Sequence, residues 1–131
     1  MFWAVQTDER RICLLGLEGG LSSSDLAQLA ERLRALAAQG MSRVVVDLRR
    51  VDHWDFRGLR ALAEAVEHRH RRGGATAFIT PNRYLRDIAA AAGVHDRFDF
   101  YDGLNLEGGP DPREGADPGP PPFRRVAGEG P

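Results

Sequence analysis

Apolar and polar residues alternate at the start of the chain and then recur with a helical period. "FWAV" and "RICLLGL" are short apolar runs separated by the polar stretch "QTDER", which predicts a β-hairpin. In the next segment the apolar residues recur at helical spacing, at Leu26, Leu29, Ala30, Leu33, Leu36 and Ala37. We therefore expect a helix that begins after an N-cap at Ser23 or Ser24 and ends at Gly40.

The middle of the chain repeats a strand-then-helix order. "RVVVDL", Arg43 to Leu48, is a β-branched apolar run typical of a strand that is buried on both faces. After the stretch "VDHWDFRGLRAL", a second helix carries an apolar stripe and ends in the basic, glycine-capped "RRGG"; the stripe is Leu59, Leu62, Ala63 and Val66. "ATAFIT" predicts the next strand and "FDFY" a last short one. Between them "PNRYLRDIAAAAG" predicts a third helix, with one face formed by Leu85, Ile88, Ala89 and Ala92.

This alternation predicts a small α/β domain over residues 1–102. Its sheet would be mostly parallel, with four to five strands, an N-terminal hairpin and three to four flanking helices. Residues 103–131 differ in composition, since they hold seven of the 8 prolines and seven of the 15 glycines. The segment also has few apolar residues. Their burial cannot offset the entropy lost when such a segment becomes ordered, and we therefore expect a flexible tail. Within it, "GPPPFRR" has the character of a polyproline ligand.

Composition narrows the class of protein. The 131 residues are enough for one domain, and 18 basic against 19 acidic residues give a net charge of −1. This balance argues against nucleic acid and acidic lipid as partners. The single cysteine, Cys13, lies in an apolar run, so we expect a buried thiol, no disulfide and a reducing compartment. No apolar run approaches the ~20 residues of a membrane span, and no signal peptide is visible, so we expect a cytoplasmic protein without membrane insertion.

The polar residues offer weak support for catalysis or metal binding. His53 and Asp55 have the character of an acid–base pair, but no Ser or Cys nucleophile lies nearby and no G-x-S-x-G turn exists. His68 and His70 are two apart on a helix and so point about 200° apart, unlike the i, i+4 pair of zinc sites. His95 is isolated. We expect neither an enzyme nor a metal site.

Two further motifs have simpler explanations than ligand binding. "LEGGLSSSDL" offers Gly19 and Gly20 before a helix, but it lacks the Lys of a P-loop and the spacing G-x-G-x-x-G. Serine capping of the first helix explains it. The basic run "HRHRRGG" suits the negative end of a helix dipole, and Glu67 can pair with Arg71 at i+4. We therefore expect no nucleotide cofactor and no nucleic-acid partner.

The order of these elements is more informative than any one of them. The strand "RVVVDL", the stretch "RRVDHWDFRGLRAL", a helix ending in "RRGG", the strand "ATAFIT" and "PNRYLRDIAAAAGVHDRFDFYD" together resemble the STAS domain, the family of bacterial anti-sigma factor antagonists. The resemblance covers roughly Met1 to Asp102. It implies a small sheet flanked by helices that does no chemistry and binds a protein partner through the loop and helix after the central strand.

In this family that loop commonly reads Asp-Ser-Ser/Ala-Gly-Leu, and here it aligns with Asp55-Phe56-Arg57-Gly58-Leu59. In phosphorylated members a partner kinase modifies the Ser or Thr before the glycine, and the added charge stops binding. That position is Arg57 here, which has no hydroxyl, and neither has Phe56. The resemblance therefore implies a binding module without the usual phosphorylation switch.

The same loop suggests which residues meet the partner. We expect Asp55 to cap the second helix, Gly58 to allow close approach to a neighbour and Trp54 to lie in the core. Phe56 is either an exposed hydrophobic anchor or folds back onto the sheet. An exposed face of the helix would continue the surface through Arg57, Arg60, Ala61, Glu64, His68 and Arg71. The expected partner-binding residues are Asp55, Phe56, Arg57, Gly58, Arg60 and Glu64.

Three functions are compatible with these features. The first is a regulator or adaptor that binds a serine-kinase-type anti-sigma factor or another signalling protein. The second is an accessory subunit of a lipid-trafficking ABC transporter that binds the ATPase, a role that needs no phosphoserine. The third is a signalling or polarity scaffold that uses the proline-rich tail as a linker. The sequence leaves open the identity of the partner and whether the domain forms a homodimer.

Overall fold

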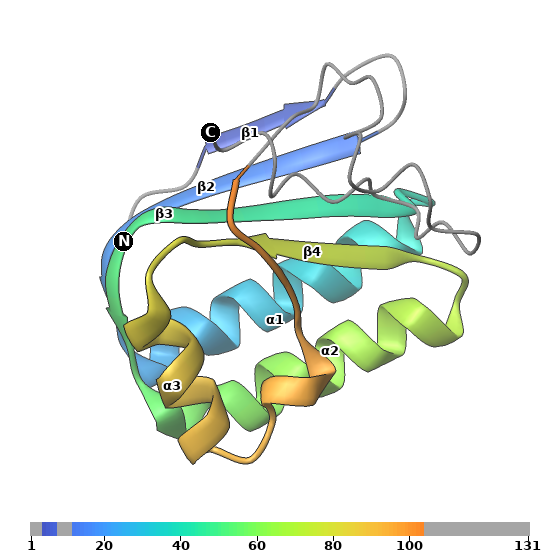
Figure 1. The fold of residues 1–131 in the computed structure, drawn as a ribbon. Coiled ribbons are helices and arrows are strands. Elements are labelled where there is room, and N and C mark those ends of the chain that lie inside the picture. Colours follow the sequence, from blue (N-terminus) through green and yellow to red (C-terminus); the bar gives the residue numbers. More distant parts are fainter. Residues whose placement is uncertain (1–3, 8–11, 104–131) are drawn as a thin grey trace, which may run out of the picture.

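The computed structural model describes residues 4–7 and 12–103. The order of elements is strand, strand, helix, strand, helix, strand, helix, strand (Figure 1). The strands are β1 (Ala4–Thr7), β2 (Ile12–Leu21), β3 (Arg43–Trp54), β4 (Ala75–Ile79) and β5 (Asp99–Tyr101). The helices are α1 (Ser23–Ala38), α2 (Leu59–Arg71) and α3 (Arg83–Ala91), and two 3-10 turns are η1 (Phe56–Gly58) and η2 (His95–Arg97).

The five strands form one sheet in the order β1-β2-β3-β4-β5. β1 and β2 pair antiparallel as the predicted hairpin, and the other neighbours are parallel. The three helices lie on one side of this sheet (Figure 1). The α/β class, the largely parallel sheet and the N-terminal hairpin are therefore confirmed.

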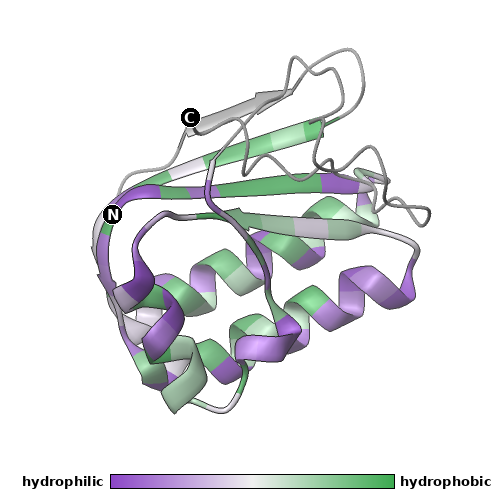
Figure 2. Ribbon diagram, in the orientation of Figure 1, coloured by the Kyte–Doolittle hydropathy of each residue, from purple (hydrophilic) through white to green (hydrophobic). Residues whose placement is uncertain are grey.

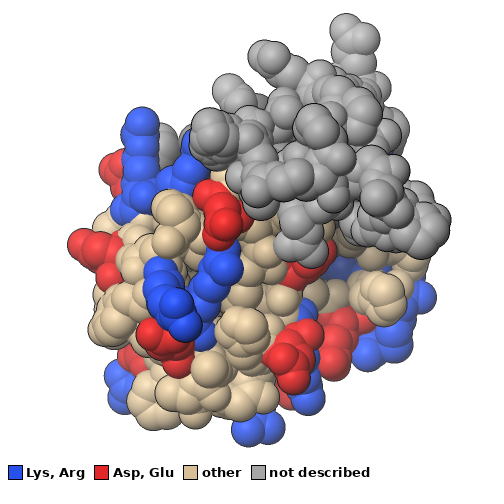
Figure 3. All heavy atoms as spheres, viewed as in Figure 1, with Lys and Arg blue, Asp and Glu red and all other residues tan. Residues whose placement is uncertain are grey.

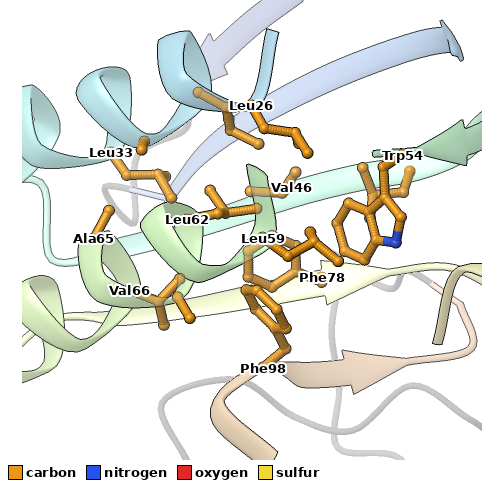
Figure 4. Close-up of a cluster of buried hydrophobic side chains, with 14 of the residues drawn as sticks. Leu26, Leu33, Val46, Trp54, Leu59, Leu62, Ala65, Val66, Phe78 and Phe98 are labelled. Carbon is orange, nitrogen blue, oxygen red and sulfur yellow. The ribbon is translucent and has the colours of Figure 1, made fainter. Parts of the chain in front are cut away.

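The main core lies between the sheet and the helices. Alternate residues of the strands, such as Val46 and Phe78, point toward the buried stripes of α1 and α2 (Figure 4), and Val44 belongs to the same cluster. All four residues of the predicted α2 stripe are buried, and so is Cys13. Burial raises the pKa of the Cys13 thiol, so the neutral, unreactive form is favoured. In Figure 2 the middle of β3 is green and its two ends carry purple segments, and the end of α2 is purple, that is, hydrophilic.

The sheet is also apolar on the face that the helices do not cover. Five buried residues form a second cluster there: Ile12, Val45, Ala77, Ile79 and Tyr101. The parallel register places them in neighbouring rows, with Val45 opposite Ala77 and Ile79 opposite Tyr101. We call this side of the sheet the outer face. Since Val44, Val45 and Val46 are all buried, β3 is buried on both faces as its sequence predicts.

Several predicted boundaries are wrong. β1 continues through Gln6 and Thr7, which were predicted to belong to the turn, and β2 continues past Leu17 to Leu21. The N-cap of α1 is Ser22, not Ser23 or Ser24, because its hydroxyl accepts a bond from the Asp25 amide while the Asp25 carboxylate accepts one from the Ser22 amide. The central strand continues to Trp54 instead of ending at Leu48. The extension forms because β2 also continues, to Leu21, and keeps pairing with β3 past two register shifts.

A buried arginine connects α2 to the amino ends of two strands. The Arg69 side chain is fully buried. Its Nε donates to Thr76 Oγ1 at 2.8 Å, and its terminal nitrogens donate to the carbonyls of Met41, Ser42 and Ala75, each at 3.1 Å. Desolvation lowers the pKa of this guanidinium, and the four acceptors offset that cost. A run of basic residues suggests a fully solvated helix end. The end of α2 is not solvated throughout, because Arg69 is buried.

The predicted flexible tail lies outside the described residues, apart from Gly103. Among the helices that the structure describes, none has the length and apolar character needed to cross a membrane.

Candidate functional site

The end of β3 is held rigidly below the loop that follows it. Trp54 is fully buried, as predicted, and its Nε1 donates to the Leu85 carbonyl at 2.9 Å. Its ring lies among aromatic neighbours, with the Phe98 centroid 5.8 Å away. The next amide, of Asp55, donates to the Leu21 carbonyl at 3.0 Å, which joins the loop to the end of β2. The residues after Trp54 therefore start from a well-defined position.

Asp55 and Arg57 form the centre of the loop. The Asp55 carboxylate accepts the backbone amide of Arg57 at 2.9 Å and so caps η1. The guanidinium of Arg57 folds back onto the same carboxylate, with its Nη2 2.7 Å from Oδ2 and its Nε 3.1 Å from Oδ1. The side-chain bond from Arg57, and then its backbone bond, lower the pKa of the Asp55 carboxyl from 3.8 to about 2. Asp55 thus stays ionised and paired.

This arrangement corrects the predicted role of Asp55 in one respect. Asp55 caps the 3-10 turn η1, whereas α2 begins after Gly58 and has no side-chain cap of its own. The turn leads directly into α2, so the capped end still lies at the start of a continuous helical segment. Arg57 is a cation at the positive end of that segment, and the Asp55 carboxylate offsets its charge there.

Gly58 allows the loop to lie against α1. A Cβ at this position would come within 2.9 Å of both Cβ and Cδ1 of Leu26 and 3.1 Å from Cα of Ser23. Any larger residue would push η1 away from the start of α1. The predicted close approach is therefore present, and its neighbour is α1. Gly58 itself is buried, so it supports the surface from beneath and does not form part of it.

Phe56 points into solvent. Its exposed fraction is 57%, so it does not fold back onto the sheet. Arg57 beside it is also exposed, at 72% of its side chain, while only 18% of the Asp55 side chain is exposed. Arg60 and Glu64 follow on the exposed face of α2. We define the docking surface as Asp55, Phe56, Arg57, Arg60 and Glu64. These residues follow one another from the end of β3 through η1 into the exposed face of α2.

Two neighbouring residues were not predicted from the sequence. Tyr84 at the start of α3 is 51% exposed, and its hydroxyl lies 3.1 Å from Nδ1 of His53 at the end of β3. Their ring centroids are 5.8 Å apart. Phe56 and Tyr84 are the two large hydrophobic side chains that are exposed in the described part of the chain. Because His53 and Tyr84 are 31 positions apart in the sequence, local patterns could not pair them.

The other motifs that suggested chemistry have structural roles in the described part of the chain. His53 contacts Tyr84, while Asp55 is engaged by Arg57, so the two do not form an acid–base pair. Gly19 and Gly20 belong to β2 and pair with β3, so they form no phosphate loop before α1. Among residues 4–7 and 12–103, no group of three or more His, Cys, Asp and Glu side chains could hold a metal ion. Acidic and basic side chains are interspersed on the face seen in Figure 3.

Comparison with known protein families gives one match. The family model described as "Mlab, STAS domain" matches residues 5–104. No curated protein sequence matches the chain.

Solved structures with a similar fold include two anti-sigma factor antagonists. The unphosphorylated form of SpoIIAA is 15% identical, with a TM-score of 0.62 over 81% of this chain and 93% of that one. The antagonist from Mycobacterium paratuberculosis is 20% identical, with a TM-score of 0.64 over 79% and 86%. The murine anion transporter Slc26a9 is 14% identical, with a TM-score of 0.57, where 71% of this chain matches 16% of the transporter. At these identities the likeness is one of fold.

Proposed function

The chain belongs to the STAS domain family, and we propose that it is a non-enzymatic protein-binding module that acts as a regulator or adaptor of the anti-sigma factor antagonist type. It docks through the loop and helix after the central strand. The observation that carries this proposal is the exposed Phe56 next to an ordered Arg57 at the edge of the domain. Aromatic and Arg side chains are the types most enriched at binding hot spots.

The docking surface is preorganised for such a contact. Three groups of Arg57 donate to the Asp55 carboxylate: the backbone amide, Nε and Nη2. Trp54 and Gly58 fix the backbone on either side. A partner that covers Phe56 gains the burial of a large apolar side chain, about 1.5–3 kcal/mol when complete, with little further ordering of the loop.

The partner that this surface fits has an apolar pocket beside acidic groups. Phe56 would enter the pocket, and the outer edge of the Arg57 guanidinium together with Arg60 would meet the acidic groups. A serine-kinase-type anti-sigma factor from the same genome is the first partner to test. Binding would be constitutive with respect to this loop, because neither Phe56 nor Arg57 has a hydroxyl that a kinase could phosphorylate.

Titration of the purified chain against that anti-sigma factor tests the proposal. The double variant Phe56→Ala, Arg57→Glu is expected to weaken binding at least tenfold, about 1.4 kcal/mol or more. The matched control is Arg34→Glu, the same charge change at an exposed position of α1. Unchanged affinity of the double variant, or equal loss in the control, would contradict the proposed docking surface.

An alternative partner is the ATPase of a lipid-trafficking ABC transporter. It is supported by the loop without a hydroxyl, since such a role requires no phosphorylation, and by the occurrence of the same fold in the transporter Slc26a9. Co-purification of the chain with an ATPase subunit, together with no affinity for any anti-sigma factor of the same genome, would favour this role. The same double variant then distinguishes whether the ATPase uses the docking surface.

A further inference from the structure

The outer face of the sheet is largely apolar, with Asp47 and Asp99 in the same rows. Leu14, Val45 and Ala77 lie side by side on three neighbouring strands, and Ile79 and Tyr101 form the next row. This face lies opposite the helices and away from the helical core (Figure 1). Parallel sheets in α/β domains are normally covered on both faces, because both faces are apolar.

This face is buried although the described helices are all on the other side. Val45 and Ala77 are each 1% exposed, and Ile79 and Tyr101 are each 2% exposed. The Tyr101 hydroxyl donates to the Asp99 carboxylate at 2.9 Å, so its polar end is satisfied at the rim of the cluster. Among the described elements, no helix covers the outer face.

We propose that the outer face binds the chain's own C-terminal segment, residues 104–131, through the apolar side chains that follow its run of three prolines. These are Phe123 and Val126, after Pro120–Pro122. The inference is independent of the docking surface, which lies on η1 and α2.

The position and length of the segment suit this role. It begins next to Gly103, two residues after β5, and Tyr101 of β5 is itself part of the outer face. Strands lie about 4.8 Å apart, so a chain that crosses from β5 to β2 spans about 15 Å. At roughly 3.3 Å per residue about five residues suffice. Phe123 is twenty residues beyond Gly103, so it can reach any part of the face.

The composition of the segment also suits an apolar sheet face. Prolines have no N–H group, so "PPP" can lie on apolar side chains without burying unsatisfied donors. Proline also restricts the free chain, which reduces the entropy lost on docking. Polyproline segments commonly dock on aromatic side chains, and Tyr101 provides one here. The tail is then a Pro-rich segment that rests on its own domain instead of a solvated linker.

Paramagnetic broadening in the full-length chain tests this. A nitroxide is attached to the variant Ala127→Cys, next to Val126, and the amide resonances of Val45, Ala77 and Ile79 are followed by NMR. Native Cys13 is buried and should not react, which the unsubstituted chain treated with the same reagent confirms. We expect strong loss of intensity at these outer-face amides and none at exposed α1 positions such as Glu31. Adding Phe123→Asp and Val126→Asp should restore the intensity, whereas Ala116→Asp in the same segment should not.

Three outcomes would overturn the proposal. The first is full intensity at the outer face with the nitroxide in place. The second is broadening that the Phe123→Asp, Val126→Asp pair leaves unchanged. The third uses a mixture of two chains, one that carries the nitroxide at natural isotope abundance and one that carries ¹⁵N but no nitroxide. If broadening occurs only between these separate molecules, a second copy occupies the face. Loss of partner binding by the docking-surface variants has no bearing on any of these readouts.

Discussion

Replacing Arg69 with Met tests how the amino end of the sheet is held. Arg69 lies on α2, is fully buried, and donates four hydrogen bonds to residues from two other segments. Three of the acceptors are the carbonyls of Met41, Ser42 and Ala75, and the fourth is the Thr76 hydroxyl. Methionine has a similar length and fills the space, so the variant removes the hydrogen bonds and the charge with little change in packing volume.

The expected loss of stability follows from two opposing contributions. Hydrogen bonds from a charged donor contribute about 1.5 kcal/mol each at the low end, so four amount to roughly 6 kcal/mol. Removing a buried cation returns several kcal/mol of desolvation cost, of which we take about 3. The free energy of unfolding should therefore fall by about 3 kcal/mol, a large part of the 5–15 kcal/mol typical of a domain. The corresponding fall in Tm is roughly 12–24 °C for a folded domain of about 100 residues.

Urea unfolding, followed by far-ultraviolet circular dichroism, measures this change. Arg71→Met is the matched control, because Arg71 is exposed on the same helix, and it should change the free energy of unfolding by less than about 0.5 kcal/mol. A double-mutant cycle with Thr76→Val should give a coupling of about 1 kcal/mol, since the 2.8 Å bond is lost in either single variant. If Arg69→Met were as stable as the control, or if the two substitutions were additive, the argued role of Arg69 would be refuted.

Two further predictions concern the loop. Gly58→Ala should lower the free energy of unfolding by about 1–3 kcal/mol in urea, because the new Cβ would lie 2.9 Å from Leu26 Cβ; Gly20→Ala, whose Cβ meets its nearest neighbour at 3.7 Å, should cost less. Because the pKa of Asp55 is lowered to about 2, its cap is fully present above pH 3.8 and is lost only as pH falls toward 2. An NMR titration of the Asp55 carboxyl should follow this, and Arg57→Met should move its pKa back toward 3.8.

The hydrophobic pattern predicted most of the fold because each element has one dominant period. The stripe of α2 illustrates both the strength and the limit of this reasoning. The stripe steps four residues from Leu62 to Val66, and three more residues reach position 69, which is indeed buried. The residue there is Arg within a basic run, and residue type alone predicts exposure. Its acceptors come from the ends of β3 and β4, and the packing that brings them together is not visible in local sequence.

The candidate site was predictable to a similar degree. The resemblance to the family singled out the loop that we propose for docking. The residue types predicted a cap at Asp55, which the structure places on η1 and not on α2, and the close approach at Gly58. The sequence could not predict that the Arg57 side chain folds onto Asp55, because an exposed Arg has many rotamers of similar energy. It also could not pair His53 with Tyr84, which depends on how α3 packs beside the end of β3.

The hydrogen bonds around position 57 separate the conformation of the loop from the identity of its side chain. The Asp55 cap uses the backbone amide of residue 57, the Asp55 amide is held by Leu21, and Gly58 allows the packing against α1. None of these contacts involves the Arg57 guanidinium, so Arg57→Ser should keep the loop conformation and present an exposed hydroxyl.

If the proposed function is correct, this substitution should create the missing switch. A serine-kinase-type anti-sigma factor that binds the chain should add one phosphate to the Arg57→Ser variant, detected as a mass increase, and none to Arg57→Ala. The phosphate would lie beside the ionised Asp55 carboxylate, and its added negative charge should weaken binding of the modified form. Binding of Arg57→Ser by the kinase without phosphorylation would show that the loop differs from that of phosphorylated family members in more than the loss of a hydroxyl.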